Sequence, residues 1–288
     1  MLGLDPDPAA LWPDSRAGQG AETPPAAPAR AAAAAVRAHC FALIDATAHA
    51  CVAVKPQLAR FELLGEAGRA VLGEVAEHAR RAGLLVIADG KRGDIDVTAQ
   101  AYASSLFGGV DTPFGRVDGL GADMATVNPL MGADALAPFV NTARASGSGV
   151  LVLVRTSNAG AADVEDLKLE DSRTVWERIA VMVDEHGRDG VGISGISDVG
   201  AVVGATEPRH LARARELMPN ATFLLPGVGA QGGRVEDLAP AFAPGRAGGL
   251  VSASRSIADA HRKTGGKPVA AARAEAERLR EAAWALSG

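Results

Sequence analysis

The sequence is poor in aromatic residues and in cysteine, and each shortage narrows what the chain can be. Aromatic residues make up 4% of the 288 positions, so a large core has to rest on Val, Leu, Ile and Ala. Only two cysteines are present, Cys40 and Cys51, and they form no CxxC pair. No disulfide framework can be read from them, and we expect both to be buried free thiols.

Lysine is also scarce, and the formal net charge is −5. This balance disfavours a nucleic-acid binder, which usually carries a basic face. It does not disfavour a small anionic substrate, because the local field of a site can oppose the global charge. A lysine at the end of an apolar strand is informative in this chain, because the only lysines are Lys55, Lys91, Lys168, Lys263 and Lys267.

Long apolar runs are missing as well. No stretch approaches the ~18 continuous apolar residues of a membrane span. The first residues, MLGLDPDPAALWP, lack the basic and apolar regions of a secretory signal. We therefore expect a soluble, cytoplasmic protein that binds neither membrane nor nucleic acid.

Short apolar segments alternate with longer amphipathic ones along the whole chain. Eight strands, each followed by a helix, predict a single-domain α/β protein over residues 1–288, a (β/α)₈ or TIM barrel. A doubly wound open sheet is the second possibility, but no GxGxxG follows the first strand. The predicted strands are 2–5, 51–56, 84–89, 124–128, 150–155, 199–205, 222–227 and 249–253. The predicted helices are 29–49, 61–82, 95–107, 133–146, 173–186, 208–217, 234–241 and 268–285.

Glycine, proline and alanine dominate two connecting segments. Residues 15–28 and 111–121 are predicted to be mobile loops. The helix near 268–285 is predicted to close the barrel. Asp5 follows only four residues, while a typical strand has ~5–6. The first strand is therefore short, or the native start lies further upstream.

The segment LLVIADGKRGDIDVT (84–98) carries the strongest chemical signal. An apolar strand runs directly into Asp89, Lys91 and Asp94. In a (β/α)₈ barrel the active site lies at the C-terminal ends of the strands. Pairing between these groups keeps the lysine charged and the acids ionised, so a substrate carboxylate would meet repulsion and a proton donor. The alternative is a surface salt-bridge cluster with Asp94 as a helix cap.

A second lysine, Lys55, ends the preceding apolar strand, CVAVKP. Neighbouring barrel strands are expected to place Lys55 beside Asp89 at the same rim. Alternatively, Lys55 extends to the surface along its apolar stem.

The last two predicted strands lead into LLPGVGAQGG (224–233) and LVSASRSI (250–257). Loops after strands seven and eight of such barrels often bind phosphate through backbone N–H groups. Arg255 can pair with a phosphate bidentately. Tight turns and an ordinary surface arginine are the alternative.

Two further polar segments follow strands. RTSNAG (155–160) offers Thr156, Ser157 and Asn158 over the barrel mouth, and Asn128 follows another strand; either could be a simple turn. The six histidines lack metal-ligand spacing, and no GxSxG or HExxH motif occurs. No metal is assigned.

Together these motifs resemble the orotidine 5′-phosphate decarboxylases. DGKRGDIDVT with the upstream AVKP resembles the Lys…Asp-x-Lys-x-x-Asp array of that family. GLDP, VNPLMG, RTSN, PGVGAQGG and ASRSI resemble its longer bacterial branch (type 2), familiar from actinobacteria. The resemblance runs from Asp5 to about Ile257, in family order.

The resemblance implies a carboxy-lyase that converts orotidine 5′-phosphate into uridine 5′-phosphate (UMP), the last step of de novo pyrimidine synthesis, without metal or cofactor. Lys91 would protonate the C6 carbanion, Asp89 would flank the scissile carboxylate and hold Lys91, and Lys55 would orient Asp89 and contact ribose. In a homodimer with shared active sites, Asp94 and Thr98 would reach the neighbouring site. The remaining substrate contacts would come from Asp5 (ribose), Ser157 and Gln231 (pyrimidine), Arg255 (phosphate) and, with a less certain fit, Asn128.

Two rival functions remain open. A related barrel that acts as a decarboxylase or aldolase on a sugar phosphate typically uses Mg²⁺, so a chelator would distinguish it. A catalytically silent nucleotide-binding barrel is disfavoured, because such a chain would be free to lose members of the array of Lys55, Asp89, Lys91 and Asp94.

Overall fold

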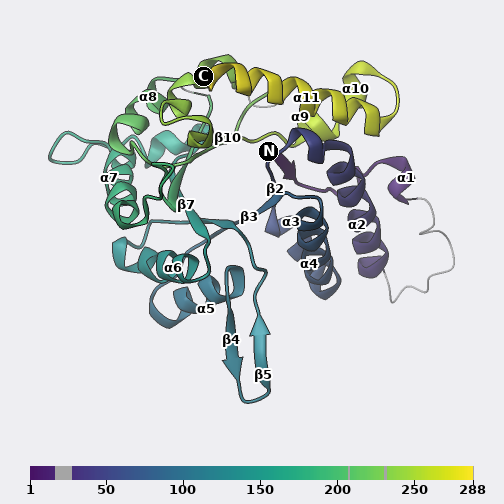
Figure 1. Ribbon diagram of the computed structural model, residues 1–288, viewed down its shortest axis with the longest axis horizontal. Coiled ribbons are helices and arrows are strands. Elements are labelled where there is room, and N and C mark those ends of the chain that lie inside the picture. Colours follow the sequence, from purple (N-terminus) through teal and green to yellow (C-terminus); the bar gives the residue numbers. More distant parts are fainter. Residues whose placement is uncertain (17–27, 207, 230–231, 288) are drawn as a thin grey trace. The chain divides into compact units, whose positions relative to one another are not determined.

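The computed structural model describes residues 1–16, 28–206, 208–229 and 232–287. The chain forms two compact units (Figure 1). Unit 1 consists of Met1–Gly90 and Ser254–Arg280, and unit 2 consists of Lys91–Ala253 and Glu281–Gly288. Both units combine parallel strands with helices, so the predicted α/β class is correct.

Unit 1 contains the first three strands of the chain. β1 (Leu2–Leu4) pairs in parallel with β2 (Ala53–Pro56), and β2 pairs in parallel with β3 (Leu85–Arg92), whose last two residues belong to unit 2. All residues of β1 and β2 are buried, as expected for strands covered on both faces. The helices are α1 (Pro13–Arg16), α2 (Pro28–Thr47), η1 (Ala48–Ala50), α3 (Leu58–Glu62), α4 (Gly65–Arg81), α9 (Arg255–Ala258), α10 (Ala260–Thr264) and α11 (Pro268–Leu286).

The helix predicted at 61–82 is wrong at its start, because two helices, α3 and α4, occupy this part of the chain. Gly65 takes a left-handed conformation with φ +61°, which ends the regular helix between them. Gly68 then allows close packing, since a Cβ there would lie 1.9 Å from the carbonyl oxygen of Phe61. The apolar pattern of the sequence continues across the break between α3 and α4. The periodicity therefore does not reveal this break.

Among the described residues, one helical segment, residues 28–50, is long and apolar enough to cross a membrane by length and composition alone. Its helix α2 contributes Val36, Cys40, Leu43 and Ile44 to the buried core of unit 1. α2 packs beside α4 and β1 (Figure 1). The buried side chains of this segment thus belong to the core of unit 1.

Trp12 links parts of unit 1 that are far apart in the sequence. Its backbone N–H donates to Nδ1 of His39 on α2 at 3.3 Å, and its indole N–H donates to the carbonyl of Ala258 on α9 at 2.9 Å. The Trp12 and His39 rings meet edge to face with centroids 5.1 Å apart. Burial lowers the pKa of His39 to about 4, with an opposing effect of Asp259. His39 is therefore a neutral acceptor at pH 7.

Unit 2 contains the remaining parallel strands, which pair in chain order. They are β6 (Met124–Val127), β7 (Gly149–Arg155), β8 (Val199–Val203), β9 (Phe223–Leu225) and β10 (Gly249–Val251). The helices are α5 (Asp96–Leu106), α6 (Ala133–Ala145), η2 (Ala159–Asp163), α7 (Val175–Gly187), η3 (Arg188–Gly190), α8 (Pro208–Leu217), η4 (Val235–Phe242) and η5 (Arg246–Gly248). The helix predicted at 234–241 is the 3₁₀ helix η4, which contains Pro240.

A buried arginine, Arg215 on α8, organises the end of unit 2 that precedes β9 and β10. Its guanidinium stacks 3.8 Å above the ring centroid of Phe223. Its two terminal nitrogens donate to four backbone carbonyls from three segments at 2.7–3.0 Å, those of Met218, Ala221, Ala241 and Gly248. Burial lowers the pKa of Arg215 to about 10, so the side chain stays charged at neutral pH.

The mobile loop predicted at 111–121 is wrong, because β4 (Gly109–Thr112) and β5 (Gly115–Asp118) form an antiparallel hairpin there (Figure 1). Thr112 pairs with Gly115, whose φ of +113° suits a tight turn. The strands are short and largely exposed, so no apolar run marks them.

The loop predicted at 15–28 is only partly testable. Ser15 and Arg16 lie in α1 and Pro28 begins α2, which corrects both ends, while residues 17–27 lie outside the described residues. The C-terminal helix predicted at 268–285 is present as α11. Both cysteines are free, but only Cys40 is buried, and Cys51 is half-buried.

Candidate active site

A buried ion pair joins the neighbouring strands β2 and β3 in unit 1. Lys55 is 7% exposed and Asp89 is 4% exposed, and the Lys55 ammonium contacts Oδ2 of Asp89. Gln57 donates its side-chain N–H to the same oxygen at 3.2 Å. The expected neighbourhood of Lys55 and Asp89 is therefore present. Gln57 was missed, although its place two residues after Lys55 puts it on the same side of an extended chain.

The strand register accounts for this cluster. β2 and β3 are parallel neighbours, with Val54 opposite Val86, and Gln57 forms an isolated parallel bridge with Asp89. The backbone N–H of Gln57 also donates to the carbonyl of Leu4 at 3.0 Å. Gln57, the residue after β2, is thus held between the last residue of β1 and Asp89 of β3.

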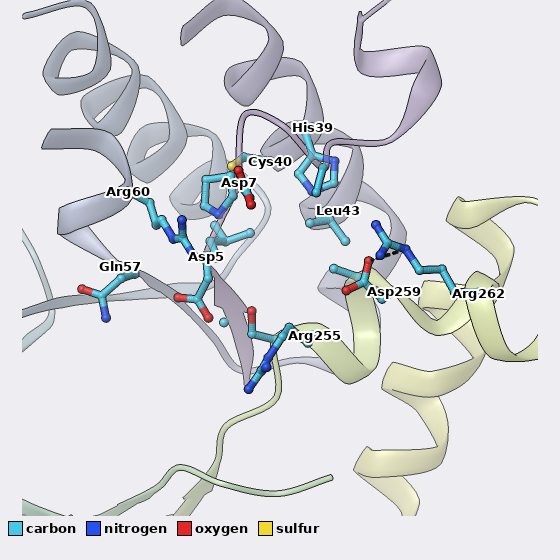
Figure 2. Close-up of a pocket in the computed structure, with 16 residues that line it drawn as sticks. Asp5, Asp7, His39, Cys40, Leu43, Gln57, Arg60, Arg255, Asp259 and Arg262 are labelled. Carbon is cyan, nitrogen blue, oxygen red and sulfur yellow. Dashed lines mark ion pairs between the residues drawn. The ribbon is translucent and has the colours of Figure 1, made fainter. Parts of the chain in front are cut away.

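A cavity of about 450 Å³ opens beside this edge in unit 1 (Figure 2). Asp5, which follows β1, Gln57 and Arg255, the first residue of α9, come together at one part of its wall. Asp259 and Arg262 form an ion pair at 3.1 Å at another part. Sequence reasoning singled out Asp5 and Arg255, and the structure brings both to one cavity.

Arginine and aspartate side chains line the cavity in equal number, together with a buried thiol. Arg60 and Arg262 line it in addition to Arg255. This composition suits an anionic ligand with hydroxyl groups, because guanidinium groups bind phosphate and carboxylates accept from hydroxyls. Burial raises the pKa of the Cys40 thiol, which also lines the cavity, so it is a poor nucleophile.

In unit 2, Lys91 has a backbone conformation that lysine rarely adopts, with φ +47°. Its backbone N–H donates to the hydroxyl oxygen of Thr126 on β6 at 2.9 Å. The carbonyl of the next residue, Arg92, accepts the backbone N–H of Asn128 at 2.7 Å. Sequence reasoning missed Thr126, because nothing in MATVNP distinguishes it from an ordinary strand residue.

Asn128 itself makes a local contact. Its side-chain oxygen accepts the backbone N–H of Leu130 at 3.0 Å, the pattern of an Asx turn. A Cβ on Gly93 would lie 3.1 Å from the Asn128 carbonyl, so the two loops pack closely. The turn interpretation of Asn128 thus has direct support.

Asp94 and Thr98 lie at the start of α5. Asp94 accepts the backbone N–H of Ile95 at 2.8 Å, and Ile95, the N-cap residue that precedes α5, makes no side-chain cap. The alternative in which Asp94 caps the helix is therefore wrong. Thr98 is exposed, as are the apolar side chains of Ile95 and Val97.

The loop after β7 holds Ser157 against the end of β8. Ser157 is half-buried, and a Cβ on Gly204 would come within 3.0 Å of its Cα. The preceding Thr156 donates its hydroxyl to Glu165 at 2.8 Å, which orders the loop. Gln231, the other predicted pyrimidine contact, lies outside the described residues.

No group of three or more His, Cys, Asp or Glu side chains lies close enough to hold a metal ion within residues 1–16, 28–206, 208–229 and 232–287.

Known proteins resemble the chain over most of its length. A family model described as "Orotidine 5′-phosphate decarboxylase / HUMPS family" matches residues 2–274. The orotidine 5′-phosphate decarboxylase of Deinococcus radiodurans is 45% identical over 247 residues, covering 85% of this chain and 84% of that protein. The enzyme of the same name from Rhodopirellula baltica is 43% identical over 234 residues, covering 80% and 75%. The structure of Leishmania donovani OMP decarboxylase is similar with a TM-score of 0.73 and 34% identity, covering 99% of this chain and 92% of that chain.

Proposed function

The chain belongs to the orotidine 5′-phosphate decarboxylase / HUMPS family, and from that membership we propose that it converts orotidine 5′-phosphate into UMP and CO₂. This reaction is the last step of pyrimidine nucleotide synthesis. The observation in the structure that best supports it is the buried ion pair of Lys55 and Asp89. A buried pair often stabilises a fold less than apolar side chains would, so its presence favours a catalytic use.

The complete architecture forms part of the same proposal. The three parallel strands of unit 1 and the five of unit 2 would close into one (β/α)₈ barrel and a single domain, with α11 closing it. The active site would then lie toward the C-terminal ends of the strands, where Asp5 follows β1 and where Lys55 and Asp89 lie in the second halves of β2 and β3. We place the enzyme in the cytoplasm, where soluble enzymes of this pathway work.

Loss of CO₂ leaves a carbanion at C6 of the pyrimidine, without an obvious electron sink. Only a preorganised positive charge at that carbon can stabilise it directly, and Lys91 would supply this charge and then the proton. Asp89, held by Lys55 and Gln57, would face the substrate carboxylate and repel it. The reaction relieves that repulsion as the carboxylate leaves as neutral CO₂.

The remaining residues would hold the substrate against this unfavourable contact. Arg255 would bind the phosphate and Asp5 the ribose, while Ser157 and Gln231 would contact the pyrimidine. Binding energy from these remote groups is then used to favour the transition state at C6. Asn128 would only shape the loop, in keeping with its Asx turn.

The proposal is tested by following the loss of orotidine 5′-phosphate absorbance in the presence of EDTA. We expect full turnover, whereas a Mg²⁺-dependent sugar-phosphate enzyme of the same family would leave this substrate unchanged. Lys91→Ala should lose at least about 3–4 kcal/mol of transition-state stabilisation, roughly a thousandfold in kcat, with an unchanged circular dichroism spectrum. Turnover within tenfold of the parent would refute the role of Lys91.

We also propose that two chains share each active site in a homodimer. Exposed apolar side chains adjoin Asp94 and Thr98 along the chain at Ile95 and Val97, and others follow Asn128 at Leu130 and Met131. Exposed apolar clusters of this kind mark interfaces between proteins. In the dimer, Asp94 and Thr98 of each chain would complete the site of its neighbour.

Subunit exchange tests the shared site. Lys91→Ala and Asp94→Ala are each expected to be inactive alone. In a mixed dimer one site receives both defects and the other receives none, so random pairing should restore roughly a quarter of all sites. Exchange is verified by tagging one variant. Verified exchange without recovered activity would place Asp94 in its own chain's site.

A further inference from the structure

The backbone of Lys91 is held in a conformation that it would not adopt unaided. Among the described residues, only Lys91, Asp96 and Ser172 combine a side chain with positive φ. The left-handed conformation costs about 1–2 kcal/mol for such residues, and glycine would adopt it without that cost. Glycine occupies positions 90 and 93, yet the strained position 91 between them holds a lysine. This choice points to a need for the lysine side chain.

The contacts that hold this conformation come from β6 and from Asn128, the residue that follows it. Thr126 is 1% exposed, and its hydroxyl oxygen accepts the Lys91 N–H at 2.9 Å. One residue further, the Arg92 carbonyl accepts the Asn128 N–H at 2.7 Å. The peptide unit before Lys91 and the one after Arg92 are thus fixed to β6 and to the residue that follows it.

The two contacts differ in kind. The Asn128 contact is between backbone groups and would survive most substitutions, whereas the Thr126 contact depends on a side-chain oxygen. Threonine is branched at Cβ and has few rotamers, so a buried threonine presents its hydroxyl from a fixed place. Only a hydroxyl-bearing residue can replace it at the same size.

We propose that Thr126 is a positioning residue that fixes the backbone of Lys91 and thereby aims its ammonium group at the reacting carbon. The inference rests on the proposed role of Lys91 as proton donor. The φ angle of residue 91 sets the direction of its Cα–Cβ bond, and a long side chain magnifies any change at its tip. A misplacement of about 1 Å in a catalytic group can cost a hundredfold in rate.

The test replaces Thr126 by Val, which keeps the branched shape and removes the acceptor. We expect kcat to fall about tenfold to hundredfold while KM changes less than threefold. Thr126→Ser restores a hydroxyl and should recover most of kcat. In the Lys91→Ala background Thr126→Val should cause no further loss, because the group that it positions is already gone.

Thr222→Val serves as the matched control. Thr222 is a second buried threonine of unit 2, and its hydroxyl donates to the Ala247 carbonyl at 2.9 Å. Its removal should lower the melting temperature about as much as Thr126→Val while leaving kcat unchanged. If Thr126→Val does not fold, Thr126→Ala removes the same acceptor without adding an apolar branch, and must show the same loss of kcat.

Two outcomes would overturn the inference. One is a kcat of the Thr126 variants within threefold of the parent, and the other is a loss confined to KM. Either result, combined with an inactive Lys91→Ala, refutes the inference and leaves the proposed function intact. Retained turnover in Lys91→Ala would instead refute the proposed function and the inference with it.

Discussion

Arg215 allows a quantitative test of the packing of unit 2. We consider Arg215→Met, which keeps the length of the side chain and removes all of its donors. Four carbonyls, those of Met218, Ala221, Ala241 and Gly248, then lose a charged donor at 2.7–3.0 Å in a buried place. The stacking of the guanidinium on Phe223 is lost as well.

The size of the effect follows from opposing contributions. A hydrogen bond to a charged group contributes about 1.5–3 kcal/mol. Two effects offset part of this loss. Methionine makes apolar contacts in the buried place, and the free-energy cost of desolvating the guanidinium is removed. We therefore expect the free energy of unfolding to fall by about 3–5 kcal/mol, which for a chain of this size lowers the melting temperature by roughly 10 °C.

Urea unfolding followed by circular dichroism measures this change. Arg213→Met on the same helix is the matched control, because Arg213 lies at the surface and pairs with Glu177 and Glu216 at 2.8 Å each. Exposed ion pairs contribute about 0–1 kcal/mol. A loss below 1 kcal/mol for Arg215→Met, or equal losses for the two variants, would refute the interpretation of Arg215 as the organising contact.

Two further predictions concern unit 1. Arg255→Ala should weaken binding of the nucleotide by about 1.5–3 kcal/mol and leave binding of the nucleoside without phosphate unchanged in calorimetry; equal losses for both ligands would show that Arg255 does not contact the phosphate. Because the pKa of His39 is lowered from 6.5 to about 4, the unfolded state takes up a proton first as pH falls. Stability present above pH 6.5 should therefore decline between pH 6.5 and 4, by on the order of 3 kcal/mol at the lower end in urea titrations. An equal decline in His39→Gln would contradict the assignment to His39.

The elements of the fold that could be predicted from the sequence are those with strong apolar patterns. Strands such as LLVIA (84–88) and VLVLV (150–154) are buried on both faces, so their apolar runs coincide with β3 and β7. The hairpin at 109–118 was not predicted, because its side chains face solvent and form no apolar run. The break between α3 and α4 escaped because it depends on the conformation of one glycine, Gly65.

The residues of the candidate site also differ in whether the sequence predicts them. Lys55 and Asp89 could be paired from the sequence, because parallel neighbouring strands end at one edge. Gln57 and Thr126 could not be identified, since their importance lies in one hydrogen bond each, to a side chain in one case and to a backbone N–H in the other. Residue type and spacing do not reveal that a strand threonine accepts a bond from a strained residue.

The hydrogen bonds made by Trp12 have a consequence for the synthesis of the protein on the ribosome. Unit 1 is discontinuous in the sequence. Residues 1–90 can complete their contacts only after Ser254–Arg280 has been synthesised, and the indole of Trp12 can donate to the carbonyl of Ala258 only then. Unit 2 is almost continuous and emerges in between. At bacterial and eukaryotic synthesis rates of about 5–20 residues per second, that interval lasts roughly ten to thirty seconds. Throughout that interval the N-terminal segment lacks the contacts that Ser254–Arg280 supply in the folded unit.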